Sequence, residues 1–133
     1  MVGSLMASDL KQRTKEFALA TVRLVERLPR GRAADVIGRQ LLRSGTSVAA
    51  NYRSARRARS RREFIAKMGI VEEETDESSF WLDLLVEAGL VPPGKVTGLR
   101  NEASELVAIT VSSIRTARGA GRDVPRSAFR VRR

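Results

Sequence analysis

Apolar side chains recur at intervals of three and four residues along most of the chain, the spacing that places them on one face of an α-helix. Four such stripes are separated by short breaks, two of which contain proline and glycine. The predicted helices span residues 9–28, 32–55, 60–88 and 95–116. The pattern therefore predicts an all-α protein.

Helices of this length joined by short links favour one architecture. Each helix must bury its apolar face against the others, and short connections make consecutive helices antiparallel neighbours. We therefore expect an antiparallel up-down four-helix bundle over residues 9–118 of the 133-residue chain. Residues 1–8 are predicted to be a flexible N-terminus, and residues 119–133 a basic, disordered C-terminal tail.

Two local features refine this picture. The middle of the second helix, from Ser44 to Ala50, consists almost entirely of small residues, which allow a neighbouring helix to approach closely. A phosphate-binding glycine loop is disfavoured there, because neither GxxxxGK[ST] nor GxGxxG follows a predicted strand. Ser60 and Glu63 match a capping box, which predicts the start of the third helix.

Composition narrows the possible chemistry. The chain contains no cysteine and no histidine, which excludes disulfides, thiolate metal sites and imidazole-based catalysis. No set of catalytic groups stands out, so we expect a protein without enzymatic activity, cofactor or metal. No apolar run approaches the roughly 20 residues of a membrane span, and the N-terminus lacks the apolar region of a signal peptide. The expected protein is soluble and cytoplasmic.

Charge points to a partner. Lysine and arginine total 25 against 15 acidic residues, and the net charge of +10 favours nucleic acid, although solubility alone is the plainer interpretation. The densest positive stretch, which we call the basic corner, spans residues 53–62 between the second and third helices. The positive N-terminal end of the third helix should strengthen anion binding there. The candidate nucleic-acid-binding residues are Arg53, Arg56, Arg57, Arg59, Arg61 and Arg62.

Residues 72–77, which we call the acid block, place five acids within six positions of the third helix. Acids this dense repel one another unless cations meet them, so arginines from another helix or another subunit are expected nearby. Glu73, Glu74 and Glu77 are accordingly candidate interface residues. A carboxylate metal site is disfavoured, because consecutive acids point around the helix.

Asn51 and Trp81 are candidate structural residues. Asn51 lies on an apolar stripe, where an amide that fixes helix register is favoured over a group that reads bases. Trp81 is predicted to widen the apolar face of the third helix together with Phe80 and Leu84. Packing is favoured over base stacking for Trp81, because no aromatic ladder accompanies it.

Several of these residues together carry a resemblance. The run QLLRSGTSV at residues 40–48, Asn51, the S-x-x-E-F start of the third helix and Trp81-Leu82 resemble the four-helix bundle family encoded in intervening sequences of bacterial 23S rRNA genes. The resemblance covers residues 9–118, with a departure at Ser54, where the family usually has Glu. It implies a homo-oligomeric ring, typically a pentamer, and no established enzymatic activity. Related bundle proteins serve as accessory factors to reverse transcriptases of diversity-generating retroelements.

The resulting hypothesis is a non-enzymatic, oligomeric bundle that binds RNA or other nucleic acid through electrostatic contacts with phosphates. The alternative is a protein–protein adaptor or scaffold, such as a reverse-transcriptase accessory factor, whose charges serve assembly. A closed ring needs two different surfaces that meet between neighbours, and the acid block and the basic corner are candidates for them. If they pair with each other, fewer arginines remain for RNA, and the sequence leaves this competition open.

Overall fold

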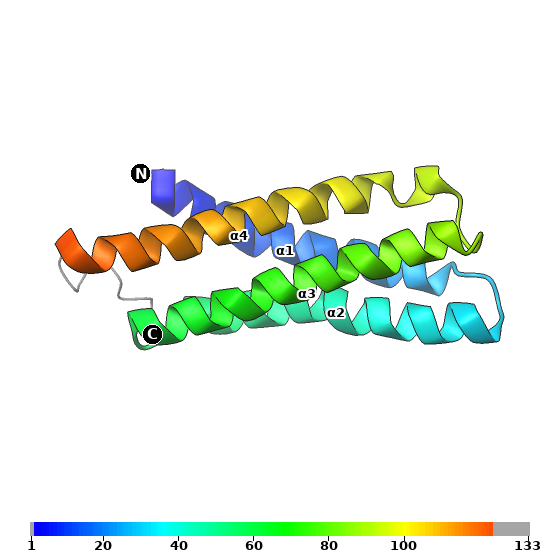
Figure 1. Ribbon diagram of the computed structural model, residues 1–133, viewed down its shortest axis with the longest axis horizontal. Coiled ribbons are helices and arrows are strands. Elements are labelled where there is room, and N and C mark those ends of the chain that lie inside the picture. Colours follow the sequence, from blue (N-terminus) through cyan, green and yellow to red (C-terminus); the bar gives the residue numbers. More distant parts are fainter. Residues whose placement is uncertain (1, 124–133) are drawn as a thin grey trace.

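The computed structural model describes residues 2–123, and within them the side chains of residues 10–119. This part of the chain contains four α-helices, one short 3-10 turn and no strand. The elements are α1 (Val2–Glu26), α2 (Arg32–Arg56), α3 (Arg61–Glu87), η1 (Pro93–Lys95) and α4 (Thr97–Asp123). They form the predicted all-α, up-down bundle (Figure 1). Assembly into a ring stays a prediction.

The helices are not packed equally against one another. The most extensive contact joins α2 to α3, while α1 packs on α2, α4 packs on α3, and the contact between α1 and α4 is much smaller than these three. Figure 1 shows the start of α1, the end of α4 and the turn between α2 and α3 at one end of the bundle. The basic corner therefore lies at the end where the described chain also begins and finishes.

The predicted apolar stripes form the core. One cluster, nearer the basic corner, includes Leu10, Phe17, Val48 and Met68, and a second, nearer the other end, is built around Leu41, Leu82, Leu85, Val91 and Val96. Phe80 is an exception to the pattern, because its side chain is 55% exposed rather than part of the apolar face. No helix within residues 2–123 combines the length and apolar composition that crossing a membrane requires.

Both outer helices are longer than predicted. Residues 2–8, predicted as a flexible N-terminus, continue α1, because this segment contains no proline to stop a helix. Within α1, Gln12 Nε2 donates to Glu16 Oε2 at 2.8 Å. At the other end, α4 runs through Gly119 to Asp123, because a glycine costs about 1 kcal/mol relative to alanine but does not forbid a helix. The remainder of the predicted tail, residues 124–133, lies outside the described residues.

The capping box at the start of α3 is confirmed. Ser60 Oγ accepts the backbone N–H of Glu63 at 3.0 Å. In return, Glu63 Oε1 accepts the backbone N–H of Arg59 at 3.2 Å, one residue before the usual position. This reciprocal pair fixes the backbone of the basic corner at the point where α3 begins.

The small residues of α2 do allow close packing. A Cβ atom on Gly45 would lie 2.7 Å from both Oγ1 and Cγ2 of Thr21 on α1. On the other side of α2, Ser78 Oγ of α3 donates to Ser44 Oγ at 2.9 Å within the core. Side chains larger than these would push α2 away from one of its two neighbours.

Candidate nucleic-acid interface

The basic corner is formed where α2 ends and α3 begins. Most of its arginine side chains are exposed, and the exception, Arg56, is half-buried. Arg57 is the C-terminal cap residue of α2, and Arg59 and Ser60 form the link to α3. The end of α2, the link and the start of α3 thus bring all six candidate arginines together. They are Arg53, Arg56, Arg57, Arg59, Arg61 and Arg62.

The corner has little negative charge to neutralise it. Glu63 is the single acid between residues 53 and 67, and its carboxylate is held at the backbone of the cap. Within residues 10–119, five of the six arginines form no ion pair. These five are Arg53, Arg56, Arg57, Arg59 and Arg62. Their guanidinium groups are available to an external anion.

Two cations of α4, outside the six candidate arginines, lie at the same end. Arg115 and Arg118 are exposed on the last turns of α4, which runs antiparallel to α3 and ends beside its start (Figure 1). Their position follows from the up-down topology, since the last helix must finish at the end where the second connection lies. The predicted up-down topology would therefore have been enough to place these two arginines near the basic corner.

The acid block meets its cation within the same chain. Arg43 of α2 donates to Glu74 Oε1 at 3.1 Å and also forms an ion pair with Glu77. The indole Nε1 of Trp81 donates to Glu77 Oε2 at 2.9 Å. Glu73 is exposed and forms no ion pair in the described part of the chain. Within the chain, Glu74 and Glu77 therefore pair with Arg43 of another helix. Pairing of the acid block with the basic corner of a neighbouring subunit stays a prediction.

These contacts shift two pKa values. The hydrogen bond from Arg43, followed by that from Trp81, lowers the pKa of Glu77 below its ordinary value of 4.5. The same partnership raises the pKa of Arg43. The pKa of Glu77 is lower in the folded protein than in the unfolded chain. The ionised carboxylate therefore stabilises the fold at any pH above the unfolded-state pKa, and this stabilisation is lost as the pH falls through the folded-state pKa.

Glu77→Gln is therefore expected to destabilise the protein at pH 7 and to have less effect near pH 3. The loss at pH 7 should be about 1 kcal/mol or less, because the ion pair is partly exposed to solvent. Urea unfolding followed by circular dichroism at both pH values measures it. Glu73→Gln, on the same helix but without an ion-pair partner, should be neutral at both. If Glu77→Gln lowered the free energy of unfolding equally at pH 7 and pH 3, the charge of Glu77 would not have the stabilising role assigned to it.

Asn51 and Trp81 hold structural positions. Asn51 Nδ2 donates to the carbonyl oxygen of Ser47 at 2.9 Å and to its Oγ at 2.8 Å, so the amide is satisfied within α2 rather than across helices. Trp81 packs edge-to-face on Phe80, with ring centroids 4.9 Å apart. Trp81 lies on α3 well away from the basic corner, whereas Asn51 is two residues before its first arginine.

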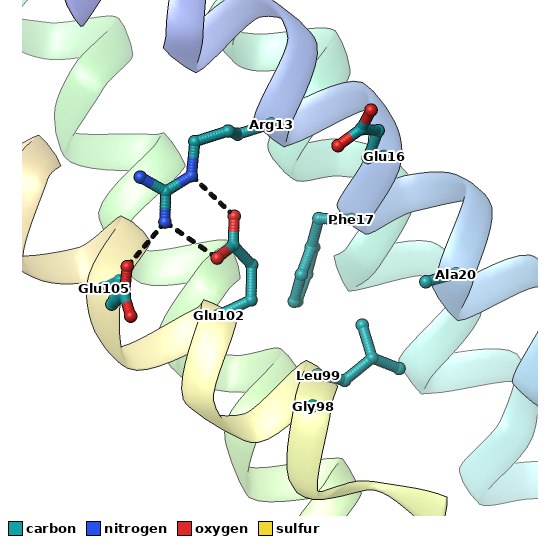
Figure 2. Close-up of a pocket in the computed structure, with 8 residues that line it drawn as sticks. All are labelled: Arg13, Glu16, Phe17, Ala20, Gly98, Leu99, Glu102 and Glu105. Carbon is teal, nitrogen blue, oxygen red and sulfur yellow. Dashed lines mark hydrogen bonds and ion pairs between the residues drawn. The ribbon is translucent and has the colours of Figure 1, made fainter.

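An open groove of about 600 Å³ separates parts of α1 and α4 (Figure 2). Arg13 bridges it, donating through Nε and a terminal nitrogen to Glu102 at 2.8 and 2.7 Å and to Glu105 at 2.8 Å. Phe17 and Leu99 form its apolar floor. The bidentate contact neutralises Arg13 and ties α1 to α4, which is a structural role. No group of acids in the described residues is arranged to hold a metal ion.

The sequence pattern of the 23S rRNA-intervening sequence protein family matches residues 7–112, which include the whole basic corner and the Arg43 contacts. The chain belongs to the 23S rRNA-intervening sequence protein family. The resemblance inferred from residues 40–82 is thereby confirmed, whereas the relation to retroelement accessory proteins stays a prediction.

A solved structure from this family has the same fold. It is a protein with unknown function from the S23 ribosomal protein family of Bacteroides thetaiotaomicron, 33% identical in sequence, with a TM-score of 0.79. The alignment covers 84% of this chain and 99% of that chain. No curated protein matches this family member.

Proposed function

We propose that the protein binds RNA or other nucleic acid through backbone phosphates at the basic corner. The observation that carries the proposal is the set of corner arginines that are without an ion-pair partner among the described residues. Guanidinium groups bind phosphate oxygens through two parallel hydrogen bonds, and the N-terminal end of α3 adds positive potential at the same place. Binding of this kind is independent of sequence and involves no catalytic step.

The contacts of the acid block within the chain favour nucleic-acid binding over assembly through pairing of the acid block with the basic corner. Glu74 and Glu77 are engaged by Arg43 of the same chain, which leaves fewer carboxylates to pair with the basic corner of a neighbour. A homo-oligomeric ring, with a pentamer as the expectation from the family, is compatible with the proposal. Several corners in one particle would raise affinity for a long polyanion through multivalency.

A second candidate function, as a protein–protein adaptor, has one observation in its favour. Phe80 and Val36 are 55% and 58% exposed, and exposed apolar side chains of this kind could contribute to a contact with another protein if they lie in one patch. Measuring the mass of the purified protein in solution with and without ribonuclease separates the two candidates. A loss of mass after ribonuclease treatment supports RNA binding, and a retained protein partner supports the adaptor.

The direct test is a titration of fluorescently labelled RNA with the protein at several salt concentrations between 50 and 200 mM. If five arginines each neutralise one phosphate, the slope of log affinity against log salt should lie at about −3.5 to −4.5. Anisotropy of the labelled RNA reports the affinity. Absence of binding at 50 mM salt, or an affinity that does not change with salt, would refute the proposed function.

A further inference from the structure

The aromatic side chains closest to the basic corner are turned into the bundle. Tyr52, at the end of α2, is only 4% exposed, and Phe64, on the first turn of α3, is partly buried and packs against the core. Among the described residues, the exposed aromatic ring is Phe80, about 28 Å along α3 from the start of that helix at 1.5 Å per residue. In the described part of the chain, the corner therefore presents no fully exposed ring on which a base can stack.

This arrangement is poorly suited to a single strand. Proteins that bind single-stranded nucleic acid combine a basic path with aromatic platforms, and each stacked base contributes about 1 to 3 kcal/mol. A corner without such platforms has only phosphate contacts to offer. Phosphate contacts are available from a duplex as readily as from a single strand.

The distribution of the charges favours two strands over one. Arginines lie on the last turn of α2, on the link, on the first turn of α3 and, through Arg115 and Arg118, on α4. Axes of adjacent packed helices are about 8–10 Å apart, so the cations form a broad patch rather than one line. Groove widths of about 6 and 12 Å in B-form DNA place phosphates of opposite strands at comparable separations.

The higher charge density of a double helix also favours a duplex over a single strand. A double helix carries one negative charge per roughly 1.7 Å of its axis and releases about 0.9 counterions per neutralised phosphate, against about 0.7 for a single strand. A site that recognises charge alone therefore gains more from a duplex at low salt.

We infer that the basic corner binds double-stranded RNA or DNA in preference to single strands, through phosphates and without reading bases. The inference rests on the proposed function and specifies its ligand. Because neither sugar nor base edges are needed for these contacts, RNA and DNA duplexes are bound with similar affinity.

The test compares three labelled probes with the full chain: an RNA duplex of about 20 base pairs, a DNA duplex of the same length, and a single strand of polyuridine of matched length. At low salt the duplexes should bind about tenfold more tightly than the single strand, and the salt slope for a duplex should be steeper by about 1 for five contacts. RNA and DNA duplexes should agree within about threefold.

Phe80→Ala provides the control for stacking at the exposed ring, and it should leave affinity for all three probes unchanged. Polyuridine bound as tightly as the duplexes, or weakened selectively by Phe80→Ala, would overturn the inference while nucleic-acid binding itself stands. A preference of more than about tenfold between the RNA and DNA duplexes would likewise overturn it, since charge alone does not discriminate them. Failure of every probe to bind would overturn the proposed function as well.

Discussion

Replacing Arg56, Arg57 and Arg59 with serine is expected to weaken RNA binding roughly ten- to a hundredfold. Each arginine that neutralises a phosphate contributes about 0.7 to 0.9 to the salt slope, so the triple variant should also lose about 2.1 to 2.7 from that slope. None of the three side chains belongs to the buried core or forms an ion pair within residues 10–119. Anisotropy titrations measure the affinity, and circular dichroism confirms that the variant is folded.

A matched control removes the same charge from the opposite end of the bundle. Arg27, Arg30 and Arg32 are exposed around the connection between α1 and α2, and they too form no ion pair in the described part of the chain. Their serine variant should retain affinity within about threefold, because salt screens charges beyond roughly 10 Å. Lysine at the three corner positions keeps the charge and should retain most of the binding.

The two serine variants together decide where binding occurs. Equal losses in both would mean that net charge, rather than the position of the basic corner, controls affinity. Full affinity and an unchanged salt slope after the corner substitutions would exclude the corner as the site.

Gly45→Ala is expected to lower the free energy of unfolding by about 1 to 3 kcal/mol, the usual effect of overpacking a close helix contact. The new methyl group would lie 2.7 Å from Oγ1 and Cγ2 of Thr21 and 2.9 Å from its Cβ. Rotating the threonine side chain cannot relieve a contact with its Cβ, and Thr21 Oγ1 is already bonded to the carbonyl oxygen of Phe17 at 2.8 Å. The helices α1 and α2 must therefore move apart.

Gly38→Ala, two turns earlier on the same helix, is the natural comparison. Its added Cβ would meet Leu28 Cδ1 at 2.9 Å, the far end of a flexible side chain that can change rotamer. Alanine is also favoured over glycine in a helix by about 1 kcal/mol, so this variant should be close to neutral. Urea unfolding of both variants measures the difference. A Gly45→Ala protein as stable as Gly38→Ala would show that α1 and α2 do not approach closely at Thr21.

The sequence was sufficient to predict features that depend on local chemistry. Helix periodicity located the bundle and bounded α2 and α3 closely, and Ser60 with Glu63 identified the cap from side-chain chemistry alone. The ends of α1 and α4 were missed for a physical reason. Glycine and a flexible composition weaken a helix without stopping it, and whether the helix continues depends on small differences in free energy.

Features that depend on contacts distant in sequence were harder to predict. The pattern indicated that the acid block needs cations, but the choice of Arg43 among 25 basic residues is made by the packing register of α2 and α3. Phe80 was predicted on the apolar face and is instead largely exposed. A residue at the edge of an apolar stripe can face either the core or the solvent, and the spacing alone does not decide which. Arg115 and Arg118 join the corner only once the topology is known.

The unequal packing of the four helices has a consequence for partial unfolding. Because α1 and α4 each rest mainly on one neighbour, either can detach locally while α2 and α3 remain together. The basic corner connects α2 to α3, which is the most extensively packed pair of helices. The charged surface is thus expected to belong to the portion of the molecule that opens last, and to keep its geometry when the outer helices loosen.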